Sequence, residues 1–149
     1  MITKEINTVK KCCLYASDFH LEMILLPYIK EKIDKSNFII ITQNDLSDTI
    51  KLLLDRVNIE TKDKKNILNL DWKAFNIENI KHINNLIKND DNFDIIINGD
   101  HSFIVEINKK LNLLSNNINI IDCFNINDKN LNIKNIKNNY KEFLNTNKI

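Results

Sequence analysis

The sequence has 149 residues, of which 43% are hydrophobic and 28% charged, and its formal net charge is +1. This length and composition are typical of one globular domain with a substantial core, so we expect a single domain over residues 1–149. The near-neutral charge and the single arginine, Arg56, argue against nucleic acid as a partner, because a phosphate backbone requires a basic surface.

The first eleven residues are polar and charged, unlike a signal peptide, and no apolar run in the sequence is long enough to cross a membrane. We therefore expect a cytoplasmic protein that does not interact with membranes. Cys12 and Cys13 are adjacent in an expected strand and should point to opposite faces of the sheet. We expect these two thiols and Cys123 to be buried and unreactive, without a disulfide or a metal.

Strands and helices alternate along the chain. The apolar segment 37–42 is almost continuous, as in a strand covered on both faces, and the apolar residues from 46 to 57 recur at helical spacing. The expected strands are 11–16, 37–42, 66–70, 93–97 and 117–124, and the expected helices are 19–33, 46–57, 77–87, 104–114 and 133–143.

This alternation predicts βαβ units, and therefore a parallel sheet with helices on both faces. The expected fold is α/β, with three layers and a doubly wound, mostly parallel five-stranded sheet of the Rossmann-like kind. Pro27 lies within the first helical segment, where it predicts either a kink or a break before Tyr28.

The turn after the first expected strand, residues 16–20, contains no glycine. The sequence lacks both GxGxxG and GxxxxGK[ST], and its only glycine is Gly99. Because these motifs bind the phosphates of nucleotides in α/β proteins, their absence argues against nucleotide hydrolysis.

Ligands of open parallel sheets bind beyond the carboxyl ends of the strands. Polar side chains follow the expected strands at these ends, and we take them as candidate contacts for a small molecule. The candidate residues are Asp18, His20, Asn98, Asp100 and Asp122.

A metal site is the alternative. If the first and fourth expected strands are neighbours, Asp18, His20, Asp100 and His101 would converge, and carboxylates with imidazoles suit a divalent metal that activates water. Asp18-x-His20, with Asn98-Gly99-Asp100 further on, resembles the opening motifs of calcineurin-like metallophosphoesterases. That resemblance implies a metal-dependent hydrolase.

A structural role is the third interpretation of these residues. Asp18, either Asn44 or Asp45, and Asp100 each precede an expected helix, where a short acceptor side chain caps free backbone N–H groups and negative charge suits the helix start.

Five segments together resemble the MEDS (methanogen/methylotroph sensory) domain family. The resemblance implies a degenerate recA-like α/β domain that senses small molecules in bacterial signalling and has no established catalysis. The expected function is therefore non-catalytic small-molecule sensing or protein interaction, without a cofactor. An unidentified small molecule or signalling protein would be the partner, and a homo-oligomer is compatible with this role. The segments are 13–15 (Cys-Leu-Tyr), 26–29 (Leu-Pro-Tyr-Ile), 38–41 (Phe-Ile-Ile-Ile), 48–51 (Asp-Thr-Ile-Lys) and 120–124 (Ile-Ile-Asp-Cys-Phe).

Overall fold

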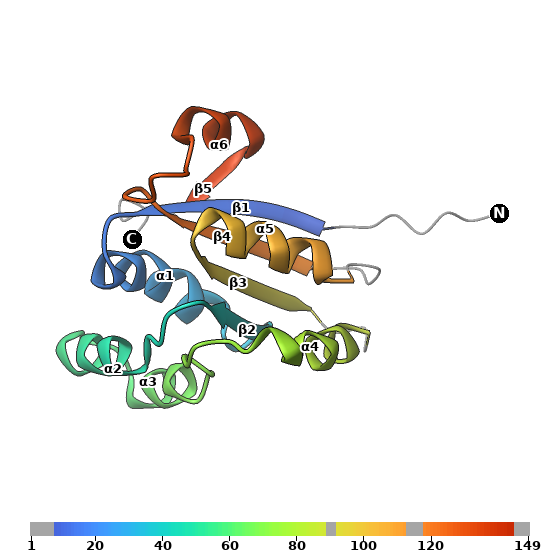
Figure 1. Ribbon diagram of the computed structural model, residues 1–149. Helices are drawn as coiled ribbons and strands as arrows, with labels where there is room; N and C mark the ends of the chain where they lie inside the picture. The colour runs from blue at the N-terminus through green and yellow to red at the C-terminus, as the bar shows by residue number, and fades with distance from the viewer. Residues whose placement is uncertain (1–7, 89–91, 113–117, 145–149) are drawn as a thin grey trace.

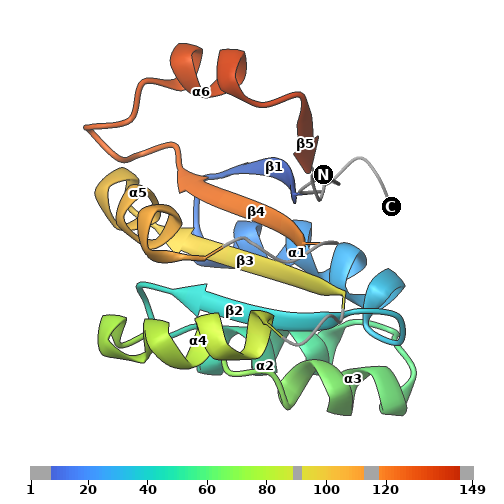
Figure 2. The same cartoon turned by 90° about the vertical axis from the view of Figure 1, so that its right-hand side faces the viewer.

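Five parallel strands form one sheet in the part of the chain that the structure describes, residues 8–88, 92–112 and 118–144. Figure 1 shows the computed structural model, and Figure 2 shows the strands side by side in the order β2-β3-β4-β1-β5. β1 lies between the last two strands of the chain, with Thr8 opposite Ile118 of β4 and Lys11 opposite Glu142 of β5. The strands are β1 (Thr8–Tyr15), β2 (Asn37–Thr42), β3 (Phe93–Gly99), β4 (Ile118–Asn125) and β5 (Glu142–Leu144).

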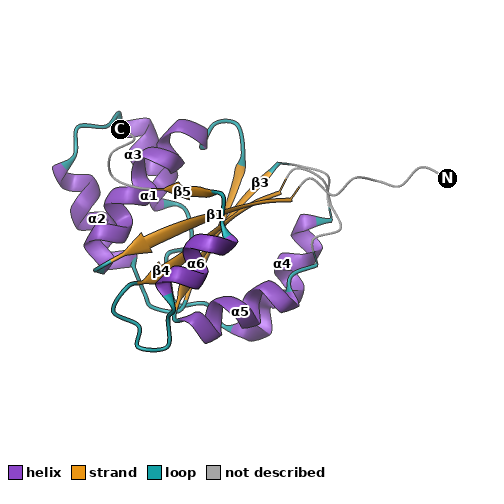
Figure 3. Cartoon of the chain, turned by 90° about the horizontal axis from the view of Figure 1, so that it is seen from above, coloured by secondary structure: helices purple, strands orange, loops and turns teal. Residues whose placement is uncertain are grey.

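Helices cover both faces of the sheet and complete three layers (Figure 3). The core on one face includes side chains of α1, α2 and α3, and the core on the other includes side chains of α4, α5 and α6. We call these faces the α1 face and the α5 face. The predicted Rossmann-like α/β fold with a five-stranded parallel sheet is confirmed. Within the described ranges, no helix has the length and apolar character needed to cross a membrane. The helices are α1 (Asp18–Lys32), α2 (Ser47–Arg56), α3 (Thr61–Leu68), the 3₁₀ turn η1 (Ile77–Asn79), α4 (Ile80–Ile87), α5 (His101–Lys110) and α6 (Ile133–Asn139).

α1 is held on the sheet by apolar residues four positions apart. Leu21, Leu25 and Ile29 have no exposed surface, and burial of each such side chain contributes about 1.5–3 kcal/mol. The helix continues through Pro27, so the alternative of a break before Tyr28 is wrong. Pro27 cannot donate to the carbonyl of Met23, and the loss is tolerated because Met23 lies on the solvent side of the helix.

The predicted strand over residues 66–70 is wrong, because this segment lies at the end of α3 and in the turn that follows it. Its few apolar residues do not distinguish a strand from the last turn of a helix. Ile67 is the buried residue of α3, and it packs into the core of the α1 face.

The last predicted helix is too long, because α6 ends at Asn139 and Phe143 belongs to β5. Tyr140 and Phe143 fit helical spacing by sequence, but the backbone at Tyr140 is already extended. Phe143 packs on the α5 face and Leu144 on the α1 face, as alternating residues of a strand do. Leu114 and Asn117, at the ends of two other predicted elements, lie outside the described residues.

The cysteines are buried and free, as predicted. Cys12 packs into the core of the α5 face, whereas Cys13 and Cys123 pack into the core of the α1 face. Burial raises the pKa of Cys123 well above its ordinary value, which keeps this thiol protonated and unreactive.

Glu22 is a buried acid between α1 and α2. Its side chain has no exposed surface, the Thr49 hydroxyl donates to Oε1, and Oε2 has no hydrogen-bond partner in the described ranges. Burial raises the pKa of Glu22 from 4.5 to about 7, although the Thr49 bond opposes the shift. Because the folded protein binds this proton more tightly than the unfolded chain, Glu22 favours folding at low pH. That contribution is lost as the pH rises from 4.5 through about 7.

We expect Glu22→Gln to raise the free energy of unfolding at about pH 8, by on the order of 3 kcal/mol, and to change it little below about pH 5. The reason is that glutamine needs no buried charge at high pH. Urea unfolding across this pH range would measure the effect. Glu31→Gln, at an exposed position of the same helix, is the control. Parallel pH profiles for Glu22→Gln and the wild type would contradict the prediction.

Candidate functional site

The turn from β1 into α1 places Ser17, Asp18 and His20 together. The Ser17 hydroxyl accepts a hydrogen bond from the backbone N–H of His20 at 3.2 Å, so Ser17 caps the helix. The His20 ring accepts from the backbone N–H of Ala16 through Nδ1 at 2.9 Å. Asp18 is the first residue of the helix and not its cap, which corrects the capping interpretation for this residue.

The turn from β3 into α5 confirms the capping interpretation for Asp100. Its carboxylate accepts from the backbone N–H of Phe103 at 2.8 Å and from the Ser102 hydroxyl at 2.9 Å. The Phe103 bond is the main cause of the lowered pKa of Asp100. Gln43 braces the turn, because its Oε1 accepts from the backbone N–H of Asp100 at 2.8 Å. Gly99 allows this approach, since a Cβ there would lie 2.8 Å from the same oxygen.

The predicted metal set does not converge in the structure. β4 lies between β1 and β3, so the turns that carry Asp18 and Asp100 are not adjacent. In the described ranges, no three or more His, Cys, Asp or Glu side chains form a group that could hold a metal ion. His101 instead lies beside the ring of Phe124, with 6.1 Å between the ring centroids.

The crevice at which Rossmann-like sheets bind ligands lies here between the carboxyl ends of β1 and β4. The chain leaves β1 towards the α1 face and leaves β4 towards α6 on the α5 face, which defines the topological switch point. The two loops bond to each other across it. The backbone N–H of Ile126 donates to the Tyr15 carbonyl at 2.8 Å, and the Asn127 side chain donates to the Ala16 carbonyl at 3.1 Å. A ligand at this crevice would have to break these bonds.

Asn98 and Asp122, the other two predicted ligand contacts, are buried on opposite faces of the sheet. On the α1 face, Asn98 accepts from the Tyr15 hydroxyl at 2.5 Å and donates to the Thr42 hydroxyl at 3.0 Å. Asn98 is 1% exposed, so this bonded group is part of the core. The predicted five-residue site is therefore divided between the two faces of the sheet.

The buried side chain of Asp122 is part of the lining of a cavity of about 490 Å³ on the α5 face. We call it the α5–α6 cavity, and its volume is typical of a small-molecule site. Apolar side chains from both helices and from β4 make up one part of the lining, and polar side chains make up the other. The lining residues are Lys10, His101, Ile104, Val105, Asn108, Lys109, Asp122, Phe124, Ile136, Asn139 and Tyr140.

A chain of hydrogen bonds runs from Asp122 to the rim of this cavity. The Tyr140 hydroxyl donates to Oδ2 of Asp122 at 2.5 Å, and the Asn108 amide donates to Oδ1 at 3.0 Å. The oxygen of Asn108 then accepts from the Lys10 ammonium group at 3.0 Å. The chain therefore fixes the position of an exposed lysine beside the cavity.

The charges and hydrogen bonds around Asp122 favour a fixed arrangement of the polar side chains in the α5–α6 cavity. Burial raises the pKa of Asp122, although its bonds from Tyr140 and Asn108 and the charge of Lys10 act in the opposite direction. Burial and the charge of Asp122 also raise the pKa of Tyr140, which keeps the hydroxyl a donor. Both oxygens of Asp122 are occupied, so this carboxylate positions its neighbours.

Sequence reasoning found Asp122 and His101 but missed Lys10, Asn108 and Tyr140, which line the same cavity. The available signal was Asp122 itself, an acid within an otherwise apolar strand, since such an acid requires donors. Its partner Tyr140 lies within the predicted helix 133–143, whereas the helix in the structure ends at Asn139. No protein-family model, curated protein or solved structure matches this chain.

Tyr140→Phe should lower the free energy of unfolding by about 1–3 kcal/mol at neutral pH, because it leaves a buried carboxylate oxygen without its donor. The loss should be smaller at acidic pH, where Asp122 is protonated. Urea unfolding at the two pH values would measure both effects. Asn139→Ala, at the exposed neighbouring position, is the control. A Tyr140→Phe protein as stable as the wild type would show that the bond contributes nothing.

Asp100→Ala should cost about 0.5–2 kcal/mol of stability, the usual effect of losing a cap, whereas Asp18→Ala should change stability by less than about 0.5 kcal/mol. Thermal or urea unfolding of the two variants would provide the comparison. A larger loss from Asp18→Ala than from Asp100→Ala would show a role for Asp18 beyond the helix start. Elemental analysis of the same proteins would test the metal alternative directly.

Proposed function

We propose that this chain is a non-catalytic cytoplasmic domain that binds a small acidic molecule in the α5–α6 cavity and acts as a sensing module in signalling. The observation that carries the proposal is the hydrogen-bonded chain from Tyr140 through Asp122 and Asn108 to Lys10. It holds a cationic group at the rim of a cavity whose volume suits a small molecule.

The charges of the lining favour an acidic ligand. Lys10 and Lys109 are exposed cations at the rim, and the imidazole ring of His101 is also part of the lining. Asp122 is the one acidic residue in the lining, and its side chain is buried. A carboxylate or phosphate at the rim would meet these cations, while an apolar body would contact Ile104 and Ile136.

The hydrogen bonds of Asp122 and the raised pKa of Tyr140 favour binding over catalysis in this cavity. A general base needs a free acceptor within reach of its substrate. Both Asp122 oxygens are already occupied, and the raised pKa of Tyr140 makes its hydroxyl a poor nucleophile. These groups are arranged to orient a ligand.

The position of α6 suggests how occupancy of the cavity would be transmitted. Among the seven residues of α6, Ile136 is the buried one, and it lines the cavity. Tyr140 follows the helix directly, and β5 begins at Glu142. A ligand that contacts Ile136 and Tyr140 would therefore bias the position of α6 and of the edge strand β5, because a weakly packed element responds to small energies.

The MEDS resemblance supports the sensing part of the proposal and itself stays a prediction. A domain of this kind would transmit the ligand signal to a signalling protein or to a second copy of itself. The surface around α6 and β5 is where such a partner would detect the change.

A panel of branched and aromatic monocarboxylates and phosphate monoesters should contain compounds that raise the melting temperature of the wild-type protein. Lys10→Met and Asn108→Ala should each weaken binding of the best compound about tenfold in calorimetric titration, because they remove or release the ammonium group at the rim. The neutral amide or alcohol analogue of that compound should bind weakly for the same reason.

Lys110→Met is the matched control, because Lys110 pairs with Glu106 at 3.3 Å on the same helix and does not line the cavity. Low salt should be used, since exposed charges are screened at higher ionic strength. Failure of every acid in the panel to stabilise the wild type, or full affinity in Lys10→Met, would refute the proposal.

A further inference from the structure

Asp94 is a second buried acid, on the face of the sheet opposite to Asp122. It is the second residue of β3 and has no exposed surface. The Tyr28 hydroxyl donates to its Oδ1, and the Lys32 ammonium group donates to the same oxygen at 2.9 Å. α1 therefore supplies two donors, and both bind one oxygen of the carboxylate.

The other oxygen, Oδ2, is buried and has no donor among the described residues. Burial of an unpaired oxygen of this kind destabilises the folded chain, and more so when the group is charged. Such a position is therefore a place where a donor from outside the chain would gain free energy.

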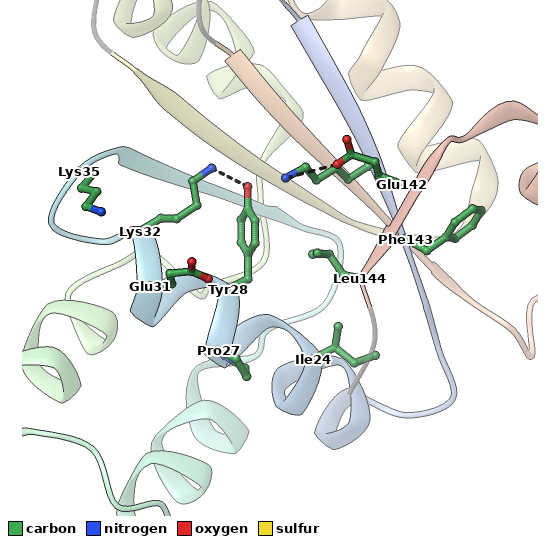
Figure 4. A pocket seen from close by; sticks show the side chains of 10 residues that line it. Ile24, Pro27, Tyr28, Glu31, Lys32, Lys35, Glu142, Phe143 and Leu144 are labelled. Carbon is green, nitrogen blue, oxygen red and sulfur yellow. Dashed lines mark hydrogen bonds and ion pairs between the residues drawn. The ribbon is translucent and has the colours of Figure 1, made fainter. Parts of the chain in front are cut away.

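The Lys32 side chain lines two cavities. The first, about 430 Å³ between α1 and β5, is lined by Tyr28 but not by Asp94 (Figure 4). The second, about 350 Å³, is lined by Asp94 with Lys32 and Lys35. We call the second one the Asp94 cavity. Asp94 lines the second cavity and not the first, so a donor from outside the chain would approach Oδ2 from the Asp94 cavity.

The cations of the Asp94 cavity differ in how firmly they are held. The Lys32 ammonium group is held by Asp94 and by the Tyr28 ring, since the Lys32 nitrogen lies 4.8 Å from the ring centroid. The nitrogen of Lys11, which lines the first cavity, lies 5.1 Å from the same centroid. In Figure 4 the Lys32 ammonium group meets the Tyr28 hydroxyl, whereas Lys35 lies further along, beyond the end of α1. Lys35 is exposed, so it can move to meet or admit a ligand.

We propose that the Asp94 cavity binds a small zwitterion that carries an ammonium group and a carboxylate, the chemistry of a free amino acid. The ammonium group donates to Oδ2 of Asp94, and the carboxylate accepts from Lys35 and from the remaining hydrogens of Lys32. Asn92, Asn119 and Ser36 supply neutral polar groups around the ligand. Oδ2 has almost no accessible surface, so the lining must shift before a ligand can reach this oxygen.

This site is separate from the α5–α6 cavity, because the sheet lies between the two. The state of the buried acid also differs, because both oxygens of Asp122 accept hydrogen bonds, whereas Oδ2 of Asp94 has no donor among the described residues. In the Asp94 cavity, the carboxylate of Asp94 and the ammonium groups of Lys32 and Lys35 leave one surplus positive charge, which pairs with the carboxylate of the ligand. The unpaired oxygen Oδ2 accepts from the ammonium group of the ligand. A ligand with only one of the two groups would leave part of the site unpaired.

The test uses the common free L-amino acids as probes, each added singly to the wild-type chain, with thermal shift as the screen and calorimetry for the affinity. At least one amino acid should bind. Its affinity should fall about tenfold or more in both Asp94→Asn and Lys35→Met, since each removes a charged hydrogen-bonding partner. Lys30→Met, an exposed lysine of α1 outside both cavities, should leave the affinity unchanged. The matching amine without a carboxylate, and the matching acid without an amine, should bind at least tenfold more weakly.

The absence of any shift with the wild type would overturn the proposal, as would unchanged affinity in Lys35→Met or in a folded Asp94→Asn protein. Circular dichroism establishes whether the Asp94→Asn protein folds. If that variant does not fold, the affinity of Lys35→Met for the amino acid alone tests the proposal. Lys10→Met should keep its affinity for the amino acid. A loss there would assign the binding to the α5–α6 cavity and would also overturn the proposal.

Discussion

Burial of the inner strands on both faces is the constraint on which the arrangement of polar groups in this protein depends. All seven residues of β3 are buried, including Asp94 and Asn98, and Asp122 is buried in β4. A polar side chain in such a strand has no access to water, so its partners must come from the chain. The three tyrosines of the sequence serve this purpose. Tyr15 donates to Asn98, Tyr28 to Asp94 and Tyr140 to Asp122.

The two proposed sites follow from the same constraint. Each lies where a helix or an extended segment brings a tyrosine to a buried acid, and each retains a cavity beside that pair. They differ in what the chain has left unsatisfied. Asp122 has both oxygens bonded and orients a cation at the rim, whereas Asp94 has one oxygen bonded and one without a donor in the described part of the chain. The packed sheet between them keeps the two sites chemically independent.

The alternation of strands and helices was sufficient to predict the layers, because continuous apolar runs such as 37–42 occur in strands covered on both sides. It did not predict β5, since three residues carry no readable period and Phe143 fits helical spacing equally well. The site was predictable only in part. An acid in an apolar strand marks Asp122, but its partner Tyr140 lies 18 residues away, and Tyr28 lies 66 residues from Asp94. Only the folded chain shows which tyrosine meets which acid.

The place of β1 in the sheet has a consequence for how the protein folds during synthesis. Among the described strands its neighbours are β4 and β5, so residue 8 pairs with residue 118, and residue 11 with residue 142. β2 pairs with β3, and β3 with β4, across shorter separations in the sequence. Of the described strands, β1 is thus made first and is among the last to find its neighbours, and pairings this distant in sequence are slow to form. Until they form, the thiols of Cys12 and Cys13, which the finished fold seals in its core, remain open to chemistry from outside.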